Sequence, residues 1–357
     1  MAGIASETGN IDYHSAVKSV WNNIVNKKYY ITGGIGSGET SEGFGPDYSL
    51  PNGSYCEACA SCGLVAFQHS MNSIYHDAKY ADLYEETLYN ALLGSLNLKG
   101  ENFYYQNPLI TEQPRYPWHY CPCCVGNISR TLLMMPEWTY QKDDEGIYLN
   151  LFIGSTMDID NVAGTDVEII LATDYPWSGD VSITVNPDET KEFTFYVRIP
   201  DRNTSELYDA VPEVSGYNSL KVNGESVRPV IKDGYAVITR TWEEGDRIDL
   251  ELPMEIQSVT ADERVEANRG KVALRYGPLV YNAERADNQD VSKVIGKIPL
   301  STEWRDDLLG GVMVIKGEWM DGSPLTAIPN YARANRIDKS MEKAVHSIVW
   351  INGILPE

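Results

Sequence analysis

The cysteines of this chain are gathered in two short segments that could carry metal or thiol chemistry. A disulfide framework would spread its cysteines along the chain that it staples, whereas clustered thiols are typical of a metal site or a reactive nucleophile. Glu57 lies inside the first segment, and both thiolates and carboxylates are ligands of tetrahedral Zn²⁺. We therefore expect the two segments to meet around a metal. The six residues are Cys56, Cys59, Cys62, Cys121, Cys123 and Cys124.

Two other interpretations of these cysteines remain open. Free cysteines are often buried as small hydrophobic side chains with no chemical role. A purely structural zinc site is the second alternative, although adjacent cysteines depart from the usual C-x₂-C spacing of zinc fingers. Such a site would use four thiols, for example Cys59, Cys62, Cys121 and Cys124.

The elements that must position the thiols are helical over the first 142 residues. Asp12 can cap a first helix, and further helices are expected at residues 61–75, 80–93 and 127–140, with Pro136 kinking or ending the last. The two cysteine segments would then precede helix N-termini, which stabilise thiolates. The Gly-rich segment 32–54 is long for a loop without structure, which indicates a functional role. The apolar stripe of the first helix is Val17, Val20, Trp21, Ile24 and Val25.

From Gly146 onward the hydrophobic period changes from 3.6 to 2, which predicts strands. Turn residues separate the alternating runs, as in an antiparallel β-sandwich. The fold class is therefore α plus all-β multidomain, divided into residues 1–142, 143–256 and 257–357. The alternating runs are Ile147, Leu149, Leu151 and Ile153; Val167, Ile169 and Leu171; Val181, Ile183 and Val185; and Phe193, Phe195, Val197 and Ile199.

The charge of the chain limits its partners. Its 29 basic and 51 acidic residues give a net charge of −22. Such a field repels phosphate backbones and anionic lipid surfaces, so neither nucleic acid nor membrane partners are expected. Neutral sugars feel little of this field, and a carbohydrate substrate is compatible with it.

Several short motifs resemble those of glycoside hydrolase family 127, in the order and with the spacing of that family. The family contains β-L-arabinofuranosidases built from an (α/α)₆ barrel and β-sandwich domains. The resemblance runs from about Tyr13 to the C-terminal end. The motifs are Tyr30-Ile31-Thr32-Gly33-Gly34-Ile35-Gly36-Ser37, Glu57-Ala58-Cys59, Leu88-Tyr89-Asn90, Phe103-Tyr104-Tyr105-Gln106-Asn107-Pro108 and Cys121-Pro122-Cys123-Cys124.

The resemblance assigns roles to individual residues of this chain. Cys123 corresponds to the nucleophile, and Glu42 to the general acid/base, with Glu39 as the fallback for that role. Glu85 and Tyr105 correspond to residues that contact the sugar. The implied zinc ligands are Glu57, Cys59, Cys123 and Cys124.

These roles imply a retaining glycoside hydrolase that cleaves β-L-arabinofuranosides or a related plant-wall sugar through a zinc-bound cysteine. The family barrel needs twelve helices and only four are expected here, so the helical region would be a partial (α/α)₆ barrel lacking its N-terminal half. A second chain or a missing N-terminal segment would complete it, and the stripe of the first helix would be partly uncovered. The alternative is a carbohydrate-binding or scaffold protein with a structural zinc site, which has no need of an acid at Glu42.

Overall fold

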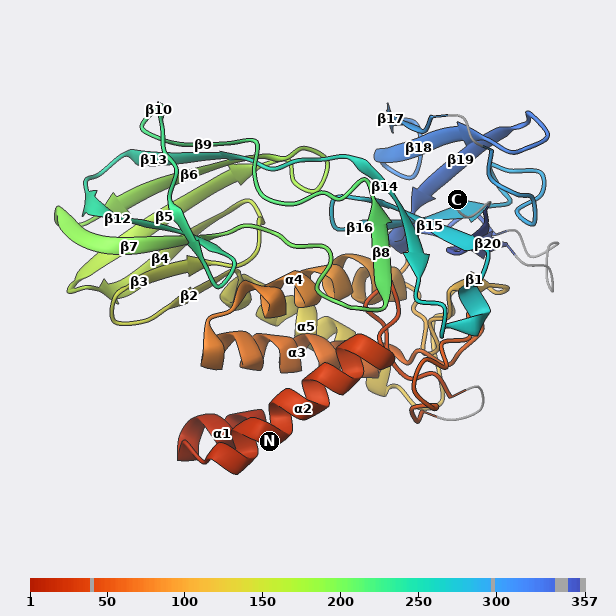
Figure 1. The fold of residues 1–357 in the computed structure, drawn as a ribbon, viewed down its shortest axis with the longest axis horizontal. Helices are drawn as coiled ribbons and strands as arrows, with labels where there is room; N and C mark the ends of the chain where they lie inside the picture. The colour runs from red at the N-terminus through yellow and green to blue at the C-terminus, as the bar shows by residue number, and fades with distance from the viewer. Residues whose placement is uncertain (39–41, 297–298, 338–345, 354–357) are drawn as a thin grey trace.

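The chain folds into a layer of helices that lies against three β-sheets (Figure 1). The structure is a computed structural model that describes residues 1–38, 42–296, 299–337 and 346–353. Most helices precede the strands, so the chain is an α plus β protein with few helices and many strands. The helices are α1 (Ala2–Thr8), α2 (Ile11–Lys27), α3 (Ala58–Tyr75), α4 (Ala78–Thr87), η1 (Leu88–Leu92), η2 (Leu93–Ser95), α5 (Cys123–Thr139), η3 (Glu266–Asn268) and η4 (Asn330–Ala332).

The four predicted helices are present, with boundaries that differ from those expected. The prediction of Asp12 as a cap is wrong: the side chain of Asn10 accepts a hydrogen bond from the Asp12 backbone N–H, so Asn10 caps α2. α5 continues through Pro136 to Thr139. The helix persists there because Met135 and Trp138 are buried on either side of the proline and hold the last turn against the core.

The helix expected at residues 80–93 is α4, which continues as the π-helical turn η1 and the 3₁₀ turn η2. Asn90 in η1 explains part of this change. Its side-chain amide donates to the carbonyls of Glu86 and Pro278, and its side-chain oxygen accepts from the Val280 backbone. The wider turn therefore places the Asn90 side chain where it hydrogen-bonds the helical layer to strand β16 (Leu279–Glu284).

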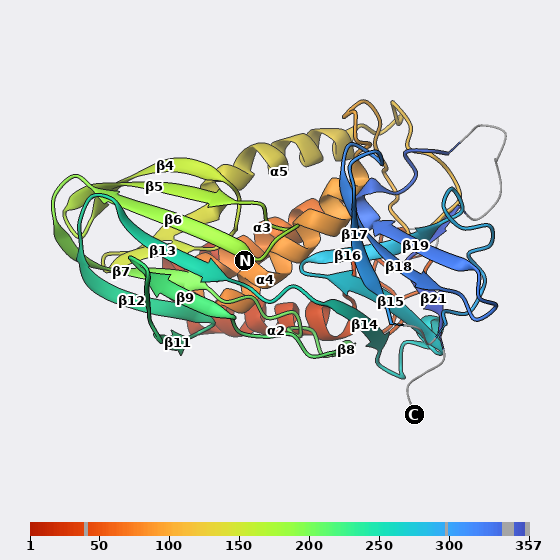
Figure 2. The ribbon, with the colours of Figure 1, turned by 90° about the horizontal axis from the view of Figure 1, so that it is seen from above.

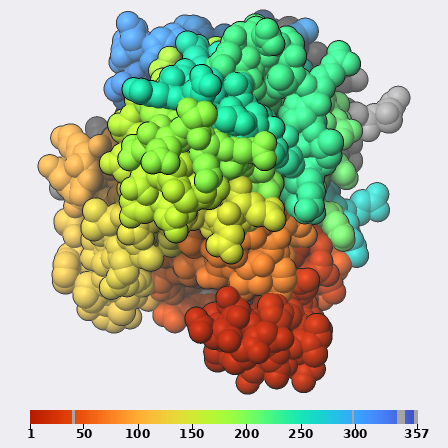
Figure 3. All heavy atoms as spheres, turned by 90° about the vertical axis from the view of Figure 1, so that its left-hand side faces the viewer, coloured from red at the N-terminus to blue at the C-terminus, as the bar shows by residue number. Residues whose placement is uncertain are grey.

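The apolar stripe of α2 is only partly covered in this chain. Val17, Trp21 and Val25 are buried, whereas Val20 is 43% exposed. In the space-filling view the N-terminal residues, coloured red, stand out at the foot of the face shown, below the rest of the helical layer (Figure 3). No helix among the described residues is long and apolar enough to cross a membrane.

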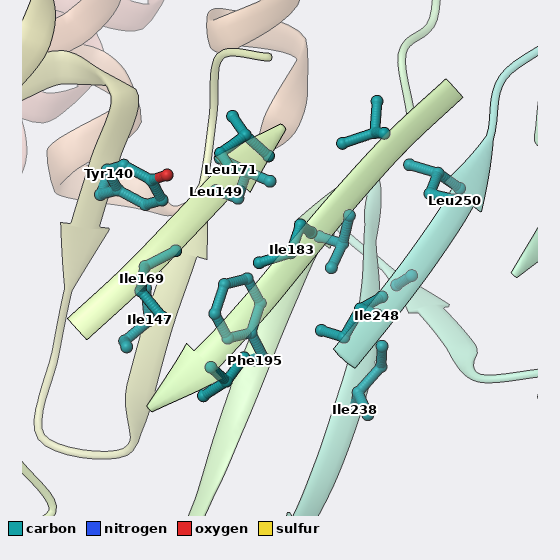
Figure 4. Close-up of a cluster of buried hydrophobic side chains, with 14 of the residues drawn as sticks. Tyr140, Ile147, Leu149, Ile169, Leu171, Ile183, Phe195, Ile238, Ile248 and Leu250 are labelled. Atoms are coloured by element: carbon teal, nitrogen blue, oxygen red, sulfur yellow. The ribbon is translucent and has the colours of Figure 1, made fainter. Parts of the chain in front are cut away.

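Two of the sheets face each other across one hydrophobic core (Figure 4). The alternating residues of β5 (Thr165–Thr173), β6 (Asp180–Pro187) and β7 (Lys191–Arg198) point into this core, as their pattern predicted. The run expected from Ile147 to Ile153 forms a strand only as far as Leu149, because Asn150 turns back to bond the helix end at Thr139. One sheet contains β10 (Glu225–Ser226), β9 (Ser219–Val222), β13 (Asp246–Glu251), β6 (Asp180–Pro187), β5 (Thr165–Thr173) and β4 (Ser155–Val162). The other contains β11 (Val230–Lys232), β12 (Tyr235–Trp242), β7 (Lys191–Arg198), β3 (Gly146–Leu149) and β2 (Tyr140–Lys142).

The third sheet lies beside these two, at the other end of the molecule (Figure 2). It includes β8 (Tyr208–Val211) from the segment 143–256 and β1 (Ile110–Thr111) from the helical region, so pairing in this sheet joins parts that are far apart in sequence. Its strands are β17 (Ser301–Arg305), β18 (Val312–Glu318), β19 (Pro324–Pro329), β16, β15 (Lys271–Tyr276), β14 (Ile256–Ala261) and β8 (Tyr208–Val211), with β1 (Ile110–Thr111), β20 (Ser347–Ile348) and β21 (Ile351–Asn352) at its side.

Candidate active site

The two cysteine segments meet where α3 and α5 begin. Cys59 lies in the first turn of α3, and Cys123 and Cys124 open α5, so all three thiols lie at helix N-termini. The Sγ atoms of Cys59 and Cys124 are 3.2 Å apart, although 65 residues separate them in sequence. Glu57 Oε1 lies 3.5 Å from Cys124 Sγ and 3.9 Å from Cys123 Sγ. The structure therefore brings the four predicted metal ligands together.

These four residues form a candidate metal centre. Their ligand atoms all lie within 4.8 Å of one another. Among the described residues, no other group of three or more His, Cys, Asp or Glu side chains is placed to hold a metal ion. Cys62 packs instead into the hydrophobic core of the helices, and Cys121 lies beside the group, with its Sγ 3.6 Å from Cys123 Sγ. The four-cysteine alternative is therefore not the arrangement that the described residues adopt.

The thiols of this group differ in exposure and acidity. Cys124 is fully buried, whereas Cys123 is partly exposed. Burial raises the pKa of Cys59 to about 12 and raises that of Cys124 further. Burial also acts to raise the pKa of Cys123, but its hydrogen bonds with Tyr105 and the neighbouring thiols lower it below its usual value. Cys123 is therefore the most acidic thiol of the three, and Cys123 and Cys59 are both partly exposed.

Tyr105 connects Cys123 with Glu42. Its hydroxyl donates to Glu42 Oε1 at 3.1 Å and lies 3.7 Å from Cys123 Sγ. The backbone fixes the ring, because Tyr105 O accepts from the Ala58 N–H at 2.9 Å and Tyr105 N–H donates to the Tyr116 hydroxyl at 2.9 Å. The sugar-contacting role predicted for Tyr105 stays a prediction, but its position beside the thiolate group is a feature of the structure.

The Gly-rich segment brings Glu42 to this place. The backbone N–H groups of Tyr55 and Cys56 donate to Gly38 O and Gly36 O, which ties the segment to the residues just before α3. Gly33 has φ +76°, and a Cβ there would lie 2.4 Å from Thr87 Cα, so no other residue fits. Glu39, the fallback for the acid, lies outside the described residues.

Glu85 lies elsewhere, in a buried ion-pair network between α4 and the sheets. Its carboxylate is fully buried, pairs with Arg198, lies 2.7 Å from Arg202 Nη1 and accepts from the Tyr175 hydroxyl at 3.1 Å. Burial acts to raise the pKa of Glu85, but the two guanidinium groups outweigh it and lower the pKa. These contacts of Glu85 are all with side chains of the fold. The predicted contact of Glu85 with a sugar stays a prediction.

Two residues of the site were missed in the sequence. Asn127 Nδ2 donates to Cys59 Sγ at 3.1 Å, and His119 stacks on the Tyr105 ring with centroids 4.4 Å apart. Asn127 follows Cys123 by four residues, so helical periodicity places both on one face of α5 once the helix is known to begin at Cys123. The start predicted at residue 127 hid this relation. His119 gave no such signal, because it lies in an irregular segment.

Comparison with known proteins covers the whole chain. Residues 1–137 match the β-L-arabinofuranosidase, GH127 catalytic domain; residues 146–254 match the GH127 middle domain; and residues 256–352 match the glycoside hydrolase family 127 C-terminal domain. The three models follow one another in the order in which the helices, the two facing sheets and the third sheet occur.

Individual relatives agree with these matches. A non-reducing end β-L-arabinofuranosidase of Bifidobacterium longum subsp. longum is 31% identical over 334 residues, which are 87% of this chain and 48% of that protein. A solved GH127 β-arabinofuranosidase is 34% identical with a TM-score of 0.91, over 98% of this chain and 58% of the other. A GH127 β-L-arabinofuranosidase from Geobacillus stearothermophilus T6 is 33% identical with a TM-score of 0.88, over 99% and 58%. The chain thus spans about half the length of these relatives, and it belongs to glycoside hydrolase family 127.

Proposed function

We propose that this protein is a retaining glycoside hydrolase that cleaves β-L-arabinofuranosides or a related plant-wall sugar, with Cys123 as the nucleophile. The observation that carries the proposal is the contact of one tyrosine hydroxyl with both Cys123 and Glu42. A nucleophile and a carboxyl group joined in this way match what a double-displacement reaction needs. The names of the relatives supply the substrate class.

The metal group fits Zn²⁺ by its chemistry. Three thiols and one carboxylate are a donor set that zinc prefers, and Zn–S bonds of about 2.3 Å place the sulfurs of a tetrahedral site roughly 3.8 Å apart. The Sγ atoms of Cys123 and Cys124 are 3.9 Å apart, and those of Cys59 and Cys124 are 3.2 Å apart. Glu57, Cys59, Cys123 and Cys124 would hold the ion. When bound, zinc keeps the thiols deprotonated and makes Cys123 a better leaving group than a free thiolate.

In the first step the Cys123 thiolate attacks the anomeric carbon and forms a C–S bond. The bond between that carbon and the leaving oxygen breaks, and Glu42 gives its proton to this oxygen. Tyr105 orients the Glu42 carboxyl through its hydroxyl and keeps the acid beside the thiolate. Cys124 is buried, so its sulfur serves as a ligand and not as the nucleophile.

In the second step a water molecule attacks the anomeric carbon of the thioglycoside. Glu42, now a carboxylate, takes the proton from that water. The C–S bond breaks, and Cys123 leaves as a thiolate. Two inversions at the same carbon return the original configuration, which defines a retaining enzyme.

The helical region would form part of an (α/α)₆ barrel, and we propose the division 1–142, 143–256 and 257–357 for the domains. The exposed part of the α2 stripe at Val20 supports a further covering element, supplied by another segment or a second chain. A carbohydrate-binding or scaffold protein with a structural metal is the alternative function. It leaves unexplained why the exposed carboxylate of Glu42 should share a tyrosine hydroxyl with the partly exposed thiol of Cys123.

Hydrolysis of p-nitrophenyl β-L-arabinofuranoside tests the proposal. Cys123→Ser should abolish turnover, because a hydroxyl is a far weaker nucleophile than a thiolate at neutral pH. Cys62→Ser, which changes a thiol outside the metal group, is the control and should retain activity. Glu42→Gln should lower the rate of hydrolysis most for substrates with poor leaving groups, which need the proton of the acid. Added azide should restore the second step of this variant, because azide attacks the thioglycoside without a general base. Near-normal activity of Cys123→Ser would show that the cysteines are structural.

A further inference from the structure

An aromatic ladder leads outward from the candidate site. The Tyr105 ring stacks on His119 with centroids 4.4 Å apart, and His119 lies 4.4 Å from the Tyr120 ring. Tyr120 is 91% exposed, and Trp118, on the other side of His119 in sequence, is 65% exposed. We call Trp118, His119 and Tyr120 the aromatic shelf.

The shelf is held in place by its own backbone. His119 Nδ1 lies 3.2 Å from both the backbone nitrogen and the backbone oxygen of Cys121, which closes a tight turn just before the thiolate segment. The Tyr116 ring flanks His119 at 5.9 Å. The imidazole is therefore fixed on two sides, and the Trp118 and Tyr120 side chains that flank it in sequence are exposed to solvent.

We propose that the aromatic shelf is the binding subsite for the leaving-group sugar of an oligosaccharide substrate. This inference rests on the proposed function. The C–H face of a sugar ring is apolar and packs on exposed aromatic rings, which recover the cost of their exposure on binding. The leaving oxygen must lie beside Glu42, and Tyr105 contacts Glu42 through its hydroxyl while its ring carries the shelf. The shelf is thus continuous with the side on which the leaving group departs.

The composition of the segment indicates a neutral sugar. Residues 116–124 contain no Asp, Glu, Lys or Arg, so they offer no cation to an acidic sugar. Arg115, which precedes the segment, is 4% exposed and donates to the carbonyls of Gly94 and Arg333.

The test compares two ligands by calorimetry in a Cys123→Ala background, where turnover cannot interfere. The ligands are a neutral β-L-arabinofuranosyl disaccharide and methyl β-L-arabinofuranoside, which lacks a second ring. Tyr120→Ala and Trp118→Ala should each lower the ratio of the two affinities about 3- to 10-fold, the size expected for one ring contact. Tyr120→Phe should restore most of the ratio, because it keeps the ring.

Trp304→Ala is the matched control, since Trp304 is a 48% exposed indole on β17, in the third sheet. It should leave the ratio unchanged. An unchanged ratio in Tyr120→Ala and Trp118→Ala would overturn the subsite, as would an altered oligomeric state, which would mean that the shelf is covered by protein. Another outcome is that the chain with Cys123 intact binds the disaccharide more tightly than the methyl glycoside and yet hydrolyses neither. That result would overturn the proposed function and leave the subsite standing.

Discussion

The Tyr105 hydroxyl lies 3.1 Å from Glu42 Oε1 and donates a hydrogen bond to it, from a residue 63 positions further along the chain. The Tyr105 hydroxyl oxygen is also 3.7 Å from Cys123 Sγ. One phenol thus contacts the group that would move the proton and the group that would attack the sugar. Its removal should disturb both.

Tyr105→Phe should lower kcat/KM about 10- to 100-fold, since a hydrogen bond to a charged group contributes roughly 1.5–3 kcal/mol. It should also raise the pKa of Cys123, because the Tyr105 hydrogen bond lowers it. The rate of alkylation of the metal-free protein, followed against pH, measures that change. Tyr104→Phe is the control, because the Tyr104 hydroxyl donates to Gln113 O and not to the site. Equal alkylation profiles for Tyr105→Phe and the parent chain would contradict this role.

Metal binding should depend on residues that sequence places far apart. Elemental analysis of the purified chain should give about one zinc per chain, and Cys59→Ala should lose it. A chelator should lower the melting temperature of the parent chain, since a metal that binds only the folded state stabilises it. Cys62→Ser should keep the metal, because Cys62 lies outside the group. A metal-free parent chain in which all six thiols titrate would end the hypothesis.

Clustered thiols beside a glutamate predicted that the two cysteine segments meet, and the structure brings them together. The spacing alone left a four-cysteine set open, and the set Glu57, Cys59, Cys123 and Cys124 came from the resemblance to family 127. The sequence predicted the helix starts poorly, because Asn10 and Asp12 are both good caps and only the tertiary packing selects between them. The buried ion pairs of Glu85 could not be predicted from the local sequence pattern. Its partners Arg198 and Arg202 lie over a hundred residues away on and after β7, and no local signal announces such a pairing. For the same reason the entry of β8 into the third sheet could not be foreseen.

The buried ion pairs around Arg198 should be essential for stability. Arg198 is fully buried, lies 2.5 Å from Asp82 Oδ1 and also pairs with Glu85. Arg198→Met would leave the buried Asp82 without its ion-pair partner and Glu85 with Arg202 alone, and breaking a buried pair in this way costs about 3–5 kcal/mol of the free energy of unfolding. Urea unfolding measures it. Arg247→Met, which removes an exposed partner of Asp249, should cost less than about 1 kcal/mol. Similar values for the two variants would mean that the buried network is solvated.

His69 should make the fold sensitive to acid. Its ring stacks on Trp138 with centroids 4.6 Å apart, and burial lowers its pKa to about 4 from 6.5. Between these two pH values the unfolded chain binds a proton at this residue and the folded chain does not. Stability from His69 is therefore complete above about pH 6.5 and is lost as the pH falls toward 4. His69→Phe keeps the stacked ring but cannot be protonated. Urea unfolding at about pH 7.5 and about pH 5 should show a smaller loss of stability in His69→Phe than in the parent chain. The same loss in both proteins would mean that the imidazole is protonated in the folded state and does not contribute.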